Sequence, residues 1–83
     1  MEVEVMNLLL LKTLNNEFII YEYQPEGKGK SGRIKYNKSL GVADVDEVAE
    51  NDADLYYANK AMVKVKNFVA NNNLPMQYTQ AWY

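Results

Sequence analysis

The stretch EGKGKSGRIK, residues 26–35, concentrates residue types that could bind an anion. It holds three glycines and four of the nine Lys and Arg residues of the chain, and it contains Gly29-Lys30-Ser31. A nucleotide-binding P-loop has the pattern G-x-x-x-x-G-K-[ST], because successive backbone N–H groups wrap the phosphates. The first glycine of that pattern would fall at position 24, which is glutamine. The stretch therefore favours a hairpin turn, in which the glycines supply permissive backbone, over a phosphate-binding loop.

The same hairpin would present a basic patch that could contact nucleic acid. Its cations are Lys28, Lys30, Arg33, Lys35 and Lys38. Phosphate contacts are mainly electrostatic, but proteins that bind single strands place cations and aromatic rings on one surface. Strand alternation would send Tyr36 to one face and Arg33 and Lys35 to the other. The pI near 5.0 is also low for a nucleic-acid binder. Nucleic-acid contact through residues 28–38 is therefore the less favoured alternative, and a solvated strand face is the preferred interpretation.

An acidic segment, DVDEVAENDAD at residues 44–54, carries six of the eleven Asp and Glu residues. A calcium-binding loop that began at Asp44 would need Gly at its sixth position and Glu at its twelfth, and the sequence has Ala49 and Leu55 there. Mimicry of nucleic-acid phosphates is a second interpretation. The preferred one is that Asp52 and Asp54 begin a helix, where carboxylates meet exposed N–H groups.

The chain contains neither cysteine nor histidine. Thiolate nucleophiles, cysteine-based metal sites, the usual general base at neutral pH and the commonest metal ligand are therefore excluded. Paired carboxylates alone can hydrolyse glycosides, but no pair stands out by its spacing. We expect a protein that is not an enzyme and that has no catalytic residue, no metal and no cofactor.

Alternating and β-branched segments predict the strands that would position these groups. Residues 3–12 and 18–23 form a predicted hairpin around Asn15, because Asn tolerates tight turns and FIIYEY is rich in strand formers. GRIKYN at 32–37 alternates strictly, as a half-buried strand does. VADVDEV, from residue 42, is a weaker fourth strand.

The pattern changes after Asn51, where apolar residues recur at spacings of three and four. The members of this stripe are Leu55, Ala58, Met62, Val65 and Val69. They predict an amphipathic helix over about 52 to 72, although 62–66 alternates like a strand. Asn51 or Asp52 would cap its start, and the Asn run 71–73 would end it. Residues 76–83 are β-prone. The fold class is thus α+β, a single domain over residues 1–83. It consists of an antiparallel meander of three to four strands, one amphipathic helix packed on the sheet and a C-terminal strand.

Aromatic residues gather in sequence at the predicted helix start and at the C-terminus. They are Tyr56, Tyr57, Tyr78, Trp82 and Tyr83, and the candidate binding residues among them are Tyr56, Tyr57, Trp82 and Tyr83. Most aromatic side chains of a small chain belong to its core or core edge. Two or three that are exposed together would form a hot spot for a protein partner. We therefore expect a non-enzymatic interaction module that binds another, unidentified protein.

The C-terminal segment 77–83 has strong strand formers, no charged side chain and no proline. It lacks the residues that usually keep an exposed edge from pairing. We expect it to insert between strands of its own sheet, with Trp82 buried against Met62 and Val65. Pairing with another chain is the alternative, so the protein is expected to be a monomer or a homodimer.

The N-terminal residues Met1 to Glu4 are acidic, unlike the basic start of a secretory signal. The apolar run 8–11 is far shorter than the ~20 residues that span a bilayer. We therefore expect a cytoplasmic protein with no membrane partner.

Several scattered positions resemble a set of short uncharacterised bacterial proteins. The matching pattern is Tyr21-x-Tyr23-x-Pro25-Glu26-Gly27, then Gly32-x-Ile34-x-Tyr36, then Asp54, Tyr57 and Trp82-Tyr83. The resemblance covers roughly residues 18 to 83 and implies a bacterial, single-domain α+β protein. It implies no activity.

Overall fold

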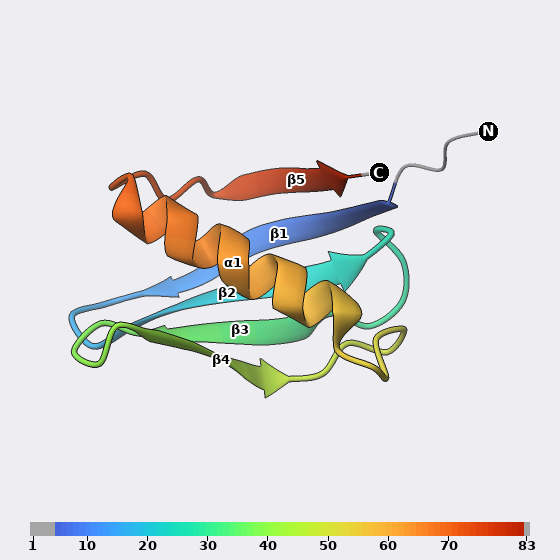
Figure 1. The fold of residues 1–83 in the computed structure, drawn as a ribbon, viewed down its shortest axis with the longest axis horizontal. Helices are drawn as coiled ribbons and strands as arrows, with labels where there is room; N and C mark the ends of the chain where they lie inside the picture. Colours follow the sequence, from blue (N-terminus) through green and yellow to red (C-terminus); the bar gives the residue numbers. More distant parts are fainter. Residues whose placement is uncertain (1–4, 83) are drawn as a thin grey trace.

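The computed structural model describes residues 5–82 as one antiparallel sheet with a helix across it (Figure 1). The acidic N-terminus at 1–4 and Tyr83 lie outside the described residues. The elements are β1 (Val5–Leu14), β2 (Phe18–Pro25), β3 (Gly32–Asn37), β4 (Val42–Glu47), α1 (Tyr56–Ala70) and β5 (Gln77–Trp82). The sheet has five strands in the order β4-β3-β2-β1-β5. The predicted α+β fold is confirmed, and the C-terminal strand joins the four-strand meander as its fifth member.

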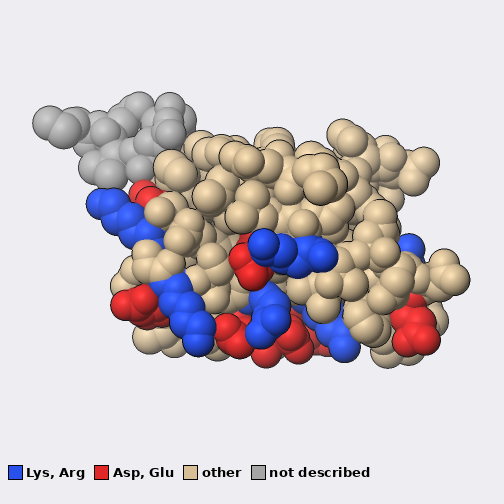
Figure 2. Space-filling view, turned by 180° about the vertical axis from the view of Figure 1, so that it is seen from behind, with Lys and Arg blue, Asp and Glu red and all other residues tan. Residues whose placement is uncertain are grey.

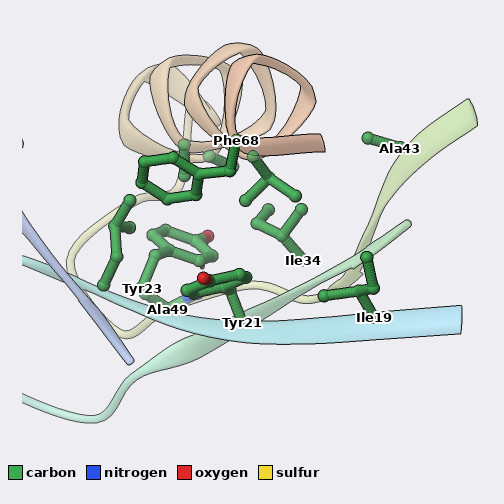
Figure 3. Packing of buried hydrophobic residues seen from close by; sticks show 11 residues of the cluster. Ile19, Tyr21, Tyr23, Ile34, Ala43, Ala49 and Phe68 are labelled. Atoms are coloured by element: carbon green, nitrogen blue, oxygen red, sulfur yellow. Dashed lines mark hydrogen bonds between the residues drawn. The ribbon is translucent and has the colours of Figure 1, made fainter. Parts of the chain in front are cut away.

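The helix covers one face of the sheet and leaves the other face open (Figures 1 and 2). Inward-facing strand residues meet the buried face of α1 in the core: Leu9, Ile19, Tyr21, Tyr23 and Ile34 from the strands, and Ala58, Ala61, Val65 and Phe68 from the helix. Of the predicted stripe, Ala58 and Val65 are buried, whereas Leu55, Met62 and Val69 are partly buried and pack against this core. Figure 3 shows Phe68 above the rings of Tyr21 and Tyr23, and the centroids of the Tyr21 and Phe68 rings are 5.5 Å apart. The residues that alternate toward one face of the strands and the residues on one face of α1 therefore lie together in the core.

The helix is shorter than the predicted 52–72 at both ends. The strand-like stretch 62–66 lies inside it, and Val63, which departs from the apolar stripe, is 60% exposed. At its end, Asn72 adopts a φ of 53° and Asn73 N–H bonds to the carbonyl of Phe68. The Asn run thus ends the helix as predicted, through a left-handed residue.

The C-terminal strand lies at an edge of the sheet, so the prediction that it inserts between strands was wrong. β5 pairs with β1 alone, in antiparallel register from Val5 opposite Trp82 to Leu10 opposite Gln77. The first four strands form a continuous meander, which leaves free edges only at β1 and β4. A strand that arrives last can join an edge without opening pairs that already exist.

Gly32 has a different role from the permissive backbone that was predicted for it. Gly27 and Gly29 do adopt positive φ, at 66° and 77°, whereas Gly32 does not. A Cβ at Gly32 would lie 2.4 Å from the ring of Tyr23 and 2.5 Å from Ala49 N. Gly32 is needed because β3 passes close both to the Tyr23 ring and to the backbone at Glu47 and Ala49.

Candidate protein-binding surface

Three aromatic residues meet where the start of α1 lies beside the end of β5. We call Tyr56, Tyr57 and Trp82 the aromatic cluster. The ring centroids of Tyr56 and Tyr57 are 5.5 Å apart in an edge-to-face arrangement, and each lies 6.0 Å from the Trp82 ring. Trp82 Nε1 donates a hydrogen bond of 2.8 Å to Tyr56 Oη. Three of the four aromatic residues predicted as a binding surface are therefore together, and the fourth, Tyr83, is not described.

Trp82 is half-buried at this position, contrary to its predicted burial against Met62 and Val65. Its ring packs on the first turn of α1, because β5 runs along the edge of the sheet and α1 lies nearest to β2, β3 and β4. Tyr78 of the same strand takes the position closer to the core and lies 5.2 Å from the Phe68 ring.

Two carboxylates fix the start of the helix that carries the cluster. Asp52 accepts bonds from the N–H groups of Tyr57 (2.8 Å) and Ala58 (2.9 Å), and Asp54 accepts one from Tyr56 N–H (3.2 Å). Both carboxylates thus meet the N–H groups of the helix start as predicted, but the two residues precede the helix, which begins at Tyr56. Leu55, with a φ of 63°, lies between them and the first helical residue. Asp52 thus caps the helix from outside its first turn.

The Asp52 carboxylate is 1% exposed and is part of a buried network. The hydroxyl of Tyr23 donates to Asp52 Oδ2 at 2.9 Å and accepts from Ala49 N–H at 3.0 Å. Burial, with the adjacent Asp52 acting in the same direction, raises the pKa of Tyr23 to about 12. The network joins β2, the segment after β4 and the helix start, so it holds the base of the aromatic cluster rigidly.

The hydroxyl of Tyr57 is tied to the loop after β2. It donates a hydrogen bond of 2.7 Å to Glu26 Oε2, which also accepts from Met6 N–H. The bond to the carboxylate raises the pKa of Tyr57 to about 12, because a phenolate would be repelled by Glu26. Tyr57 is therefore a neutral donor at physiological pH and is held in one orientation.

A second polar network, which was not predicted, joins β5 to the helix. Asn7 is fully buried on β1, and its Nδ2 donates to the carbonyl of Tyr57 (3.0 Å) and to Gln80 Oε1 (3.3 Å). Gln80 Nε2 in turn donates to the carbonyl of Lys60 at 2.9 Å. These bonds fix the end of β5 that carries Trp82 relative to α1. The sequence contained one sign of this network, which is the position of Asn7 in an apolar run, two residues before Leu9.

Lys60 adds a positive charge to the aromatic cluster. Its Nζ lies 5.3 Å from the centroid of the Trp82 ring and 5.9 Å from that of Tyr56. Both distances fall within the range of cation–π attraction. Tyr56 is 44% exposed, so the surface of this cluster offers aromatic faces, a hydroxyl and an ammonium group within one small area.

The basic residues of the predicted patch are divided between a loop and the open face of the sheet. Lys28 and Lys30 lie in the loop between β2 and β3, whereas Arg33 and Lys35 project from β3 onto the open face. Arg33 Nη2 pairs with Glu47 Oε1 at 2.9 Å, and Lys30 Nζ lies 4.0 Å from the same carboxylate. Arg33 holds the pKa of Glu47 below its ordinary value. Two of the basic side chains, Lys30 and Arg33, are therefore neighbours of acidic residues of the segment 44–54.

The open face of the sheet is divided by charge (Figure 2). Charged side chains gather over β2, β3 and β4, and the part over β1 and β5 carries almost none.

In residues 5–82 the structure contains no pocket, no group of three or more potential metal ligands and no helix long and apolar enough to cross a membrane. Comparison with protein-family models, with curated proteins and with solved structures finds no match to this chain.

Proposed function

We propose that this protein is a non-enzymatic interaction module that binds another protein through the aromatic cluster and Lys60. The observation that carries the proposal is the group of three aromatic rings from two elements, held in fixed geometry at the surface. Trp and Tyr are the residues that most often dominate protein interfaces, because they combine a large apolar area with a polar group. The absence of Cys suits the reducing cytoplasm, where we propose that the module acts.

The cluster is preorganised for binding. The indole N–H of Trp82 and the hydroxyl of Tyr57 are already bonded to Tyr56 and Glu26. Side chains that are fixed before association lose less entropy when a partner binds. The hydroxyl of Tyr56 accepts from Trp82 and keeps its own proton available for an acceptor on the partner. Lys60 favours a partner whose surface presents a carboxylate or a carbonyl here.

Nucleic-acid contact through residues 28–38 is the weaker candidate. Arg33 is engaged by Glu47 and lies 4.0 Å from Asp46, and Lys35 Nζ lies 4.3 Å from the centroid of the Phe18 ring. A phosphate backbone would have to compete with these acids, and it would be repelled by them. The proximity of β4 therefore favours protein binding over nucleic-acid binding.

Affinity capture tests the proposal. The immobilised wild type, Tyr56→Ala and the double variant Lys28→Glu/Lys30→Glu are exposed to nuclease-treated lysate of the organism of origin, and retained proteins are quantified by mass spectrometry. We expect a protein that the wild type and the double variant retain and that Tyr56→Ala loses. Val63→Ala, an exposed helix position outside the cluster, is the matched control and should retain it. Retention that depends on Lys28 and Lys30, or that Tyr56→Ala leaves intact, would show that the aromatic cluster is not the binding surface.

A further inference from the structure

The outer edge of β5 presents backbone groups that have no partner among residues 5–82. Leu11 N–H donates to the carbonyl of Met76 at 2.9 Å. Because bonded and non-bonded pairs alternate in an antiparallel ladder, residues 78, 80 and 82 also bond to β1. The N–H and C=O groups of Gln77, Thr79 and Ala81 then point away from β1. In the described chain no strand lies on that side.

The two edges of the sheet differ in how they are protected. The edge strand β4 carries Asp44, Asp46 and Glu47, and its pairing with β3 has a register shift. Charges and bulges of this kind keep an edge from pairing with another chain. β5 has no charged residue, no proline and no irregularity in its register. Of the two edges, only β5 remains open to pairing.

Uncharged side chains continue from this edge onto the open face. Gln77, Thr79 and Ala81 project to that face, next to Leu10, Leu8 and Met6 of β1 in the observed register. Figure 2 shows this part of the face almost free of charged side chains. The surface beside the edge therefore opposes neither the approach of another strand nor the removal of water.

We propose that β5 pairs antiparallel with β5 of a second copy of this chain, which forms a two-fold symmetric dimer with a continuous ten-stranded sheet. The three outward-facing residues are spaced by two, with Thr79 at the centre. Antiparallel pairing about this centre places Thr79 opposite its counterpart and Gln77 opposite the second copy's Ala81. Every outward N–H and C=O then finds a partner, which is the self-complementarity that a two-fold interface requires.

Contacts on the helix side of the two paired β5 strands favour a second copy as the partner of this edge. With Thr79 on the two-fold axis, residue 76 of one copy lies opposite residue 82 of the other. Met76 is 74% exposed, and Trp82 is half-buried at the end of the strand. A methionine against an aromatic ring is a favourable contact. The dimer would thus cover an exposed methionine with the edge of the aromatic cluster, at both ends of the interface.

Two lysines predict how the dimer responds to salt. Lys60 and Lys64 lie on the helix side of β5, with Nζ atoms 5.3 Å from the centroid of the Trp82 ring and 4.8 Å from that of Tyr78. Dimerisation brings the two lysines of one copy toward the two lysines of the other. The repulsion between these four positive charges is screened as ionic strength rises. The dimer should therefore become tighter with added salt, unlike an interface that is held by opposite charges.

Sedimentation velocity on the full chain tests this inference, which does not depend on the proposed protein partner. We expect the wild type to shift from monomer to dimer as concentration rises toward about 1 mM, with a lower dissociation constant at higher salt. Thr79→Lys places two like charges opposite each other at the axis and should weaken the dimer roughly tenfold or more. Thr79→Pro removes only an outward N–H and should act in the same direction.

Val63→Lys is the matched control, because it adds the same charge at an exposed position on the helix. It should dimerise like the wild type. Circular dichroism establishes whether each variant is folded. If Thr79→Pro does not fold, Thr79→Lys alone decides the test. A wild type that remains monomeric at every concentration and salt level would overturn the proposal. A Thr79→Lys variant that dimerises as tightly as the wild type would overturn it too.

Discussion

Removal of the Tyr23 hydroxyl tests whether the buried network holds the base of the aromatic cluster. Tyr23→Phe deletes one oxygen from a fully buried side chain and leaves the ring in place, so it creates almost no cavity. The oxygen makes two bonds, to Asp52 Oδ2 at 2.9 Å and from Ala49 N–H at 3.0 Å. Both partners are buried and would lose a bond that water cannot replace.

Tyr21→Phe is the matched control, on the same strand and the same face. Tyr21 is also fully buried, but its hydroxyl makes a single bond, of 2.6 Å, to the carbonyl of Pro75. Pro75 is only half-buried, so its carbonyl can be hydrated after the change. The two substitutions remove the same atom and differ in the number and burial of its partners.

The expected costs follow from these partners. A hydrogen bond to a charged group contributes about 1.5–3 kcal/mol and a neutral one about 0.5–1.5 kcal/mol. Tyr23→Phe should therefore lower the free energy of unfolding by about 2–4 kcal/mol, and Tyr21→Phe by about 0.5–1.5 kcal/mol. Urea denaturation followed by far-ultraviolet circular dichroism measures both values. If Tyr23→Phe costs no more than Tyr21→Phe, the buried network does not stabilise the helix start as we argue.

Three further outcomes are expected. Gly32→Ala should destabilise the fold by about 3 kcal/mol or more in urea denaturation, because the new methyl group would collide with the Tyr23 ring and with backbone atoms of Glu47 and Ala49. Asp52→Ala should cost about 3 kcal/mol in the same assay and Asp54→Ala about 1 kcal/mol or less, since Asp52 caps two N–H groups from a buried position and Asp54 caps one from the surface. Glu26→Gln should lower the pKa of Tyr57 from about 12 toward 10.0, measured by ultraviolet titration of tyrosinate. Because the folded pKa exceeds the unfolded one, the stabilisation from Tyr57 is complete below pH 10 and is lost as pH rises toward 12.

Local patterns predicted the elements but not their arrangement. The alternation of β3 and the apolar periodicity of α1 involve residues that are close in sequence. Both elements are present, although α1 is shorter at both ends than predicted. The position of β5 depends on which edges of the sheet the four-strand meander leaves free. This information is not contained in the sequence pattern of β5 itself. The predicted insertion of β5 between strands was wrong for that reason, and so was the predicted burial of Trp82 against Met62 and Val65.

The candidate surface could be predicted only in part for the same reason. Tyr56, Tyr57 and Trp82 were identified because exposed aromatic groups favour interfaces, whatever their neighbours. The roles of Asn7 and Gly32 arise from contacts with residues that are distant in sequence, Gln80 and Ala49 among them. The pairing of Arg33 in the basic hairpin with Glu47 of β4 is another contact of this kind.

Titration calorimetry with the captured protein tests the central claim most directly. If the aromatic cluster is the binding surface, Tyr56→Ala should weaken binding by roughly thirtyfold, the loss of about 2 kcal/mol typical of a hot-spot residue. Val63→Ala should leave the dissociation constant within about twofold of the wild-type value, as expected for a residue outside the interface. Equal affinity of the wild type and Tyr56→Ala, with both proteins folded, would contradict the claim that this protein binds its partner through the aromatic cluster.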